Sequence, residues 1–298
     1  MMKMQMRPRA EAANRKQEGG RVAVVAGSGM LPRQVVDALL RQGEKPYIVA
    51  IEGEAKPSDY AELDIRPVPP ARLALMLPEL SRLGVDRLVL AGGVATRPPL
   101  RQLRFPPAFL LQLPRLIKAY AQGDDGLLRA VIGFIESRGI KVVGAHEIAP
   151  DLLAPAGPLG RVRPNRNDLR DIKAAAEAAR AIGSLDIGQA AIAVGGRAVA
   201  LEGIEGTDGL LERMKALRDH GRLAGARGGV LAKCAKPQQD ARADLPAIGP
   251  QTIVDAAQAG LSGIAVDAER AMVLDMAETI KRADELGLFV LGMRESDN

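Results

Sequence analysis

The stretch RVAVVAGSGMLP, residues 21–32, decides the fold of the first half of the chain. Its β-branched run at residues 21–26 predicts a buried strand, and a helical pattern follows from residue 31 to about residue 40. A strand, a glycine turn and a helix in this order open a doubly wound α/β domain. In such a turn, Gly27 and Gly29 let the backbone approach an anion at the start of the helix. We therefore predict that this turn positions a nucleotide or sugar phosphate.

The alternation of strands and helices continues outward from this stretch. Strands are expected at residues 47–52, 86–91 and 140–144, and helices at residues 71–83, 108–121 and 125–138. Such alternation predicts a largely parallel sheet covered by helices. The fold class is therefore α/β, with a Rossmann-like parallel-sheet domain at residues 21–149. We expect the basic arm at residues 1–20 to be disordered.

The pattern changes after residue 149. Residues 150–167 are rich in proline, glycine and arginine, which indicates a linker. An amphipathic helix is expected at residues 169–182. Strands at residues 189–194 and 197–202 flank Gly195-Gly196, which is a hairpin signal. We therefore predict that residues 168–298 form a mixed α/β domain with at least one antiparallel pair of strands.

Composition narrows the classes of ligand and location. The net charge of +5 suits an anionic ligand, whereas four Phe, three Tyr and no Trp leave few platforms for stacking bases, so we expect no nucleic-acid partner. The single cysteine and two histidines exclude a Cys-based zinc site or a histidine-rich centre, so a metal here would be a hard ion on oxygen ligands. We see neither a signal peptide nor a membrane-spanning run, and we expect a cytoplasmic protein.

Polar residues gather in two loops of the second half, residues 202–208 and 233–246. Their carboxylates can hold Mg²⁺ or orient a water molecule, and Lys233, Lys236 and Arg242 can neutralise phosphate oxygens. This composition suits phosphoryl-transfer chemistry. Two simpler interpretations stay open. Thr207 or Asp208 is a good residue to cap a helix that opens there, and the acids of the second loop can form surface ion pairs of little consequence.

Longer motifs carry a family resemblance. In the second half these are LDIGQ (185–189), EGIEGTDGLLER (202–213) and LAKCAKPQQDARADLPAIGPQTI (231–253). In the first half they are VVAGSGMLP (24–32), LAGGVATRP (90–98) and the stretch from residue 121 to residue 147 that ends in GIKVVGAHE. Together, from about residue 21 to residue 292, they resemble the LpxI family, the UDP-2,3-diacylglucosamine pyrophosphatases of lipid A biosynthesis.

The resemblance implies hydrolysis of UDP-2,3-diacylglucosamine to UMP and 2,3-diacylglucosamine 1-phosphate (lipid X), with Mg²⁺ or Mn²⁺. It implies that the substrate lies between a Rossmann-like domain and a distinct C-terminal domain. Asp244, Asp208 and Lys233 are the predicted catalytic residues, and Asp244, Asp208 and Glu202 the predicted metal ligands. We also expect a homodimer. The predicted substrate-binding residues are Gly27, Gly29, Leu31, Gly92, Gly93, Asp124, Asp125, Gln189, Thr207, Lys236, Gln239 and Arg242.

Parts of the sequence also fit two other functions. Gly27 and Gly29, with Glu52 ending the next strand, resemble a nicotinamide-dinucleotide fingerprint, but the third glycine is missing and Pro32 stands where close helix packing is wanted. A non-catalytic nucleotide- or lipid-binding regulator would use the charged loops for recognition only. Residues 97–120 interleave basic and apolar side chains, which suits either transient contact with the inner membrane surface or a core helix with a basic outer face.

Overall fold

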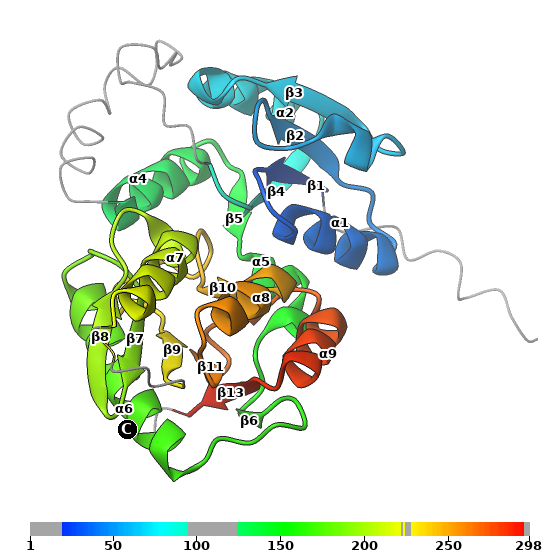
Figure 1. Ribbon diagram of the computed structural model, residues 1–298. Coiled ribbons are helices and arrows are strands. Elements are labelled where there is room, and N and C mark those ends of the chain that lie inside the picture. Colours follow the sequence, from blue (N-terminus) through cyan, green and yellow to red (C-terminus); the bar gives the residue numbers. More distant parts are fainter. Residues whose placement is uncertain (1–19, 95–123, 222, 224–227, 295–298) are drawn as a thin grey trace, which may run out of the picture.

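The computed structural model describes residues 20–94, 124–221, 223 and 228–294. They form two α/β units, each built around its own sheet (Figure 1). The expected helix at residues 108–121 and the basic stretch at residues 97–120 lie outside the described residues, as does most of the arm at residues 1–20. Within the described ranges, no helix is both long and apolar enough to cross a membrane.

The first sheet is parallel throughout, with the strand order β3-β2-β1-β4-β5. This order confirms the predicted doubly wound domain, and it places the topological switch between β1 and β4. Ligands of such sheets bind outside the carboxyl ends of the strands at this switch. The strands are β1 (Arg21–Ala26), β2 (Tyr47–Ile51), β3 (Ile65–Val68), β4 (Val85–Ala91) and β5 (Lys141–Val143), and the α-helices are α1 (Leu31–Arg41), α2 (Leu77–Arg82), α4 (Asp124–Glu136) and α5 (Ala145–Ile148).

Both faces of this sheet are buried, and β1 shows why its sequence is an apolar run. Val22, Val24 and Ala26 pack in the same cluster as residues of α1, whereas Ala23 packs in a second cluster with Ile132 of α4. Successive side chains of a strand point to opposite faces, so a strand covered by helices on both sides needs apolar residues on both faces. β1 meets that requirement from Val22 to Ala26, after the half-buried Arg21 at its start.

Prolines explain two differences from the expected elements. The single helix predicted at residues 71–83 is wrong: a 3-10 helix, Pro70–Met76, precedes α2, and Pro78 stands in the first turn of α2. A proline lacks the N–H that would continue the preceding helix. β3 was not predicted because it contains Pro67, and a proline is tolerated there because β3 is an edge strand.

The second sheet is mixed, with the strand order β6-β13-β11-β9-β7-β8. The hairpin of β7 and β8 is antiparallel as predicted, and β7 also pairs antiparallel with β9. A separate two-stranded sheet joins β10 to β12. Its strands and those of the main sheet are β6 (Gly157–Pro158), β7 (Ala190–Val194), β8 (Arg197–Leu201), β9 (Val230–Lys233), β10 (Ala247–Ile248), β11 (Gly263–Asp267), β12 (Met272–Val273) and β13 (Phe289–Met293).

Helices cover both faces of the second sheet. The helix α6 (Arg166–Ser184) packs its alanine-rich side on one face, while α7 (Gly206–Asp219), α8 (Pro250–Gln258) and α9 (Met276–Leu286) pack on the other. Part of the predicted linker at residues 150–167 joins this unit, because β6 pairs with β13. The carboxyl end of β9 and the start of β7 meet at one edge, where Ala190 pairs with Lys233. Polar residues beyond that edge form the second half of the site.

Candidate active site between the two sheets

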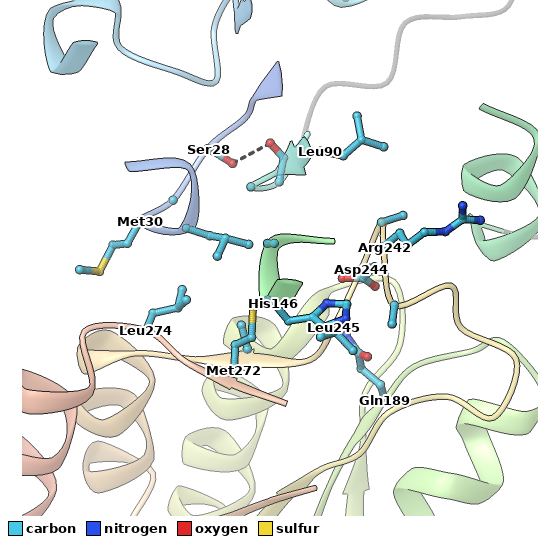
Figure 2. A pocket seen from close by; sticks show the side chains of 18 of the residues that line it. Ser28, Met30, Leu90, His146, Gln189, Arg242, Asp244, Leu245, Met272 and Leu274 are labelled. Carbon is cyan, nitrogen blue, oxygen red and sulfur yellow. Dashed lines mark hydrogen bonds between the residues drawn. The ribbon is translucent and has the colours of Figure 1, made fainter. Parts of the chain in front are cut away.

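A pocket of about 260 Å³ lies where the two units meet, and both contribute to its walls (Figure 2). The first unit supplies the turns after β1 and β4 together with the start of α5. The second unit supplies the start of β7, the end of β9 and the loop that leads into β10. The lining residues are Ser28, Gly29, Met30, Leu31, Leu90, Gly92, Gly93, Ala145, His146, Gln189, Lys233, Ala241, Arg242, Ala243, Asp244, Leu245, Ala247, Met272 and Leu274.

The turns after β1 and β4 bind each other through their backbones. The N–H of Ser28 donates to the carbonyl of Gly93 (2.8 Å), and the N–H of Gly93 donates back to the carbonyl of Ser28 (3.0 Å). A Cβ on Gly27 would lie 2.2 Å from the Gly93 oxygen, and one on Gly92 would lie 2.4 Å from the Ser28 oxygen. We call Gly27 to Gly29 together with Gly92 and Gly93 the glycine edge. Gly27 and Gly92 are therefore required for contact between two turns, whereas Gly29 faces open space in the pocket.

The opposite wall is the loop at residues 234–246, which we call the site loop. At its start, the Cys234 N–H donates to the Gln189 carbonyl (2.9 Å), and Cys234 itself is buried. At its end, the Met272 N–H of β12 donates to the Pro246 carbonyl (2.8 Å). The Ala235 N–H also donates to the buried carboxylate of Asp267 (2.9 Å). Both ends of the loop are therefore tied to strands of the second unit.

Asp244 is held by one side chain of the same loop. The Gln239 amide donates to Asp244 Oδ2 at 2.6 Å, and the carbonyl of the same amide accepts from the Lys236 N–H at 3.1 Å. Oδ1 of Asp244 accepts no hydrogen bond from any described residue. The carboxylate is half-buried, so a fixed orientation and one open oxygen leave it able to bind a metal ion or a water molecule.

The cations near the pocket differ in how far they are neutralised. Lys236 pairs with Asp186, and Arg242 makes two hydrogen bonds to Asp240 and one to Glu136 of α4. These bonds raise the pKa of Arg242 and lower that of Asp240. Lys233 donates to the carbonyl of Ala247 (3.0 Å), and no described carboxylate pairs with it. A half-buried ammonium that lines a pocket without a carboxylate partner is suited to bind an anion.

Glu202 and its neighbours stand outside this pocket. Glu202 is buried, and its two oxygens accept from the Gln189 N–H (2.7 Å) and the Thr207 hydroxyl (2.6 Å). Thr207 and Asp208 both lie inside α7, whose N-cap residue is Glu205, so the interpretation of either as the cap is wrong. Thr207 instead uses its hydroxyl on Glu202. Asp208 is exposed.

The predicted metal ligands are not brought together. In the described part of the chain, no group of three His, Cys, Asp or Glu side chains is placed to hold a metal ion, so Asp244, Asp208 and Glu202 do not form one ligand set. The physical reason is that Glu202 is occupied by two protein donors and Asp208 faces solvent. Mg²⁺, however, often takes only one or two carboxylates and completes its shell with water and substrate phosphates. The open oxygen of Asp244 fits that mode of binding.

Most of the other predicted residues meet at the pocket. Gln239 and Lys236 lie in the site loop behind Asp244. Asp124 and Asp125 begin α4, and their side chains lie outside the described residues. The predicted residues that line the pocket are Gly29, Leu31, Gly92, Gly93, Gln189, Lys233, Arg242 and Asp244.

Sequence reasoning missed His146 and the apolar wall. His146 follows β5, so it stands at the same carboxyl edge of the parallel sheet as the glycine edge, and this position was the available signal. Met30, Met272 and Leu274 form an apolar side of the pocket, and Figure 2 shows them apart from the polar groups of Asp244, Arg242 and Gln189. The pocket is thus polar on one side and apolar on the other.

The fold and site together define a class: a two-domain α/β protein with a pocket at the switch point of a Rossmann-like sheet. Among the described residues, the pocket offers a carboxylate with one oxygen free of donors and a lysine with no carboxylate partner. Comparison with known proteins makes the assignment specific. The LpxI N-terminal domain model matches residues 21–152 and the LpxI C-terminal domain model matches residues 155–291. The chain belongs to the LpxI family.

Relatives agree with this assignment. The chain is 40% identical, over 278 residues, to the UDP-2,3-diacylglucosamine pyrophosphatase LpxI of Caulobacter vibrioides, covering 92% of this chain and 97% of that protein. Among solved structures, WbmG of Bordetella bronchiseptica with NAD and UDP covers 42% of this chain and 37% of its own, with 12% identity and a TM-score of 0.28. The structure of gox2253 covers 93% of this chain and 78% of its own, with 12% identity and a TM-score of 0.34. Likenesses this weak bear on neither fold nor ligand.

Proposed function

We propose that this chain hydrolyses the diphosphate of UDP-2,3-diacylglucosamine in lipid A biosynthesis and releases UMP and 2,3-diacylglucosamine 1-phosphate. Membership of the LpxI family and the name of the Caulobacter relative support the substrate. One observation of the structure carries the chemistry. Asp244 and Lys233 line the same pocket, and in the described part of the chain one oxygen of Asp244 has no donor and Lys233 has no carboxylate partner.

The two ends of the substrate match the two sides of the pocket. The diphosphate is anionic and suits the polar side, where Lys233 supplies a positive charge. The acyl chains of the other end are apolar, and the parts of them nearest the sugar suit Met30, Met272 and Leu274. A pocket of about 260 Å³ is smaller than the ~300–1,000 Å³ usual for a whole ligand, so the uridine and the acyl chains extend beyond it.

Hydrolysis forms one bond from a water oxygen to one phosphorus and breaks the bond from that phosphorus to the bridging oxygen, which leaves with the other phosphate. The attacking water gives up one proton, which passes to the leaving oxygen or to solvent. Asp244 either orients this water or holds the metal ion. Lys233 balances negative charge on the diphosphate, and Gln239 keeps the Asp244 carboxylate turned into the pocket. Charge stabilisation of this kind is the main contribution that a protein makes to phosphate transfer.

The proposal includes a divalent cation, Mg²⁺ or Mn²⁺. Asp244 would hold it together with oxygens of the substrate, since both ions prefer oxygen ligands. When bound, the ion would neutralise charge on the phosphate that is attacked. The remaining donors would come from the substrate and from water rather than from further carboxylates.

The test is product analysis with the purified full chain. The protein is incubated with UDP-2,3-diacylglucosamine in detergent micelles and with Mg²⁺, Mn²⁺ or EDTA. The products are separated by chromatography, then identified and quantified by mass spectrometry. We expect UMP and 2,3-diacylglucosamine 1-phosphate in equal amounts with a metal ion, and none with EDTA. Tight binding of the intact substrate without turnover under either ion would contradict the proposal and identify a regulator instead.

A further inference from the structure

We propose that His146 is a catalytic residue whose imidazole contacts the substrate diphosphate from the N-terminal unit, opposite Asp244. The inference rests on the proposed function and adds a residue to its site. His146 lines the pocket together with Asp244 and Lys233, and Figure 2 shows its ring pointing from α5 toward the loop that carries Asp244. It is one of two histidines in the chain, and the other, His220, is exposed at the end of α7.

The backbone before His146 makes room for the ring. A Cβ on Gly144 would lie 2.4 Å from Cε1 and 2.6 Å from Nδ1 of His146. Gly144 has φ −70° and ψ 145°, which any residue adopts, so its backbone does not require a glycine. What requires the glycine is the position of the imidazole. The same Cβ would lie 3.3 Å from Cα of Arg242, which shows how closely this strand end meets the site loop.

The ring has no hydrogen-bond partner among the described residues. Its Nδ1 is enclosed and unpaired there. Enclosed polar atoms in proteins are almost always paired, and an exception calls for a ligand or a functional role. A side chain that is positioned by a glycine, lines a pocket and lacks a partner in the described part of the chain is therefore best explained by a partner that arrives with the substrate.

The chemistry of the pocket selects that partner. The walls around His146 offer a lysine and an arginine, both suited to phosphate oxygens, and an imidazole N–H donates to the same oxygens. His146 stands on the N-terminal unit, while Lys233 and Asp244 stand on the C-terminal unit. The diphosphate would thus be contacted from both units, and the reaction would require them to be held together.

Kinetics of UMP release test the proposal with four variants of the full chain. We expect His146→Ala to lower kcat about 100-fold with a KM within about threefold of wild type, which is the loss typical of one transition-state donor. The variant His146→Gln keeps an amide N–H near the position of Nε2. We expect its kcat to be at least about fivefold higher than that of His146→Ala. Gly144→Ala, which displaces the ring without removing it, should lower kcat about tenfold or more. The matched control, His220→Gln, should have the kcat and KM of the wild-type chain.

Several kinetic results would overturn the proposal. Wild-type kcat in His146→Ala would do so, and so would equal losses in His146→Ala and His146→Gln. Absence of UMP release by the wild-type chain would instead contradict the proposed function itself, so the two failures are distinguishable.

A second measurement needs no turnover and no folded His146 variant. Both histidines of the Asp244→Asn chain are modified with diethyl pyrocarbonate, with and without UDP-2,3-diacylglucosamine in micelles, and carbethoxylation is followed by peptide mass spectrometry. We expect the substrate to slow modification of His146 at least about fivefold, because an occupied pocket covers the ring, and to leave His220 unchanged. Equal protection of both histidines, or of neither, would contradict contact between His146 and the substrate.

Discussion

The glycine edge and the site loop face each other across one pocket, but they are built in opposite ways. The glycine edge is held by backbone hydrogen bonds between Ser28 and Gly93, and its glycines leave no room for a side chain at Gly27 or Gly92. The site loop is tied by backbone hydrogen bonds at its ends, but its polar side chains are oriented by one another, with Gln239 on Asp244 and Arg242 on Asp240.

This difference separates two kinds of requirement. Changes in the glycine edge act on the shape of the pocket and on stability, because the contacts there are backbone to backbone. Changes in the side chains of the site loop act mainly on reactivity, because the backbone hydrogen bonds that tie both ends of the loop do not depend on those side chains.

Two glycines of the glycine edge provide the sharpest contrast. Gly92 (φ 86°) and Gly29 (φ 89°) have nearly the same backbone conformation, but a Cβ meets the Ser28 oxygen at 2.4 Å in the first and open space in the second. We expect Gly92→Ala to lower the free energy of unfolding by about 3 kcal/mol or more, and Gly29→Ala by about 1–2 kcal/mol, the cost of positive φ alone. Urea denaturation measures both. Equal losses would show that contact between the turns contributes nothing.

Glu202 tests whether a carboxylate near the site is structural. Glu202→Gln keeps the shape but removes the negative charge, so the Gln189 N–H donates to a neutral oxygen and the Thr207 hydroxyl must reverse to accept from the new N–H₂. Replacing hydrogen bonds to a charged acceptor by neutral ones costs about 1 kcal/mol or more. The matched control is Glu212→Gln on α7, where the side chain is 75% exposed, and we expect no loss there. A fully stable Glu202→Gln whose UMP release needs far more Mg²⁺ would contradict the structural role and restore Glu202 as a metal ligand.

Replacement of Gln239 tests whether its hydrogen bond to Asp244 orients that carboxylate for catalysis. Gln239→Ala frees Asp244 Oδ2 and should lower kcat for UMP release about tenfold, equivalent to ~1.4 kcal/mol, with little change in unfolding. Gln238→Ala, an exposed neighbour in the same loop, serves as the control and should retain full activity. Equal activity in the two variants would show that Asp244 needs no support from Gln239.

The smallest effect concerns the ion pair of Asp240 and Arg242. Hydrogen bonds from Arg242 lower the pKa of Asp240 below 3.8 in the folded state. The pair therefore stabilises the fold at neutral pH, and this contribution is lost as the pH falls through the lowered pKa. Because Arg242 is 37% exposed, Asp240→Asn should cost less than about 1 kcal/mol at neutral pH. Thermal unfolding should show this difference shrinking toward about pH 3. A difference that is constant with pH would contradict the assignment.

Much of the fold could be predicted from local pattern, because both sheets consist of apolar runs that end in glycine or polar residues. β1 was predicted at its observed bounds, and the hairpin of β7 and β8 was predicted from Gly195-Gly196. β10 and β12 could not be, because strands of two residues exist only through their pairing with each other. The edge strand β3 was not predicted because Pro67 interrupts its strand pattern.

The site was predictable where a motif is contiguous and not where the fold assembles it. Asp244, Lys233 and Arg242 stand in one stretch of sequence, and all three line the pocket. His146 lies far from that stretch and reaches the pocket only because β5 ends at the same edge as β1 and β4. Glu202 and Asp208 were predicted as metal ligands from the family motif at residues 202–213, but burial of the first and exposure of the second keep them from sharing a metal ion.

The most direct test of the account is turnover by Asp244→Asn. This change keeps the size of the side chain and its acceptor for Gln239 while removing the negative charge. We predict that UMP release from UDP-2,3-diacylglucosamine with Mg²⁺ falls at least about 1,000-fold. The midpoint of thermal unfolding should stay within about 2 °C of wild type. The control Asp219→Asn changes an exposed acid at the end of α7 and should retain full activity. Turnover by Asp244→Asn within about tenfold of wild type would contradict the central claim that Asp244 carries the chemistry of this pocket.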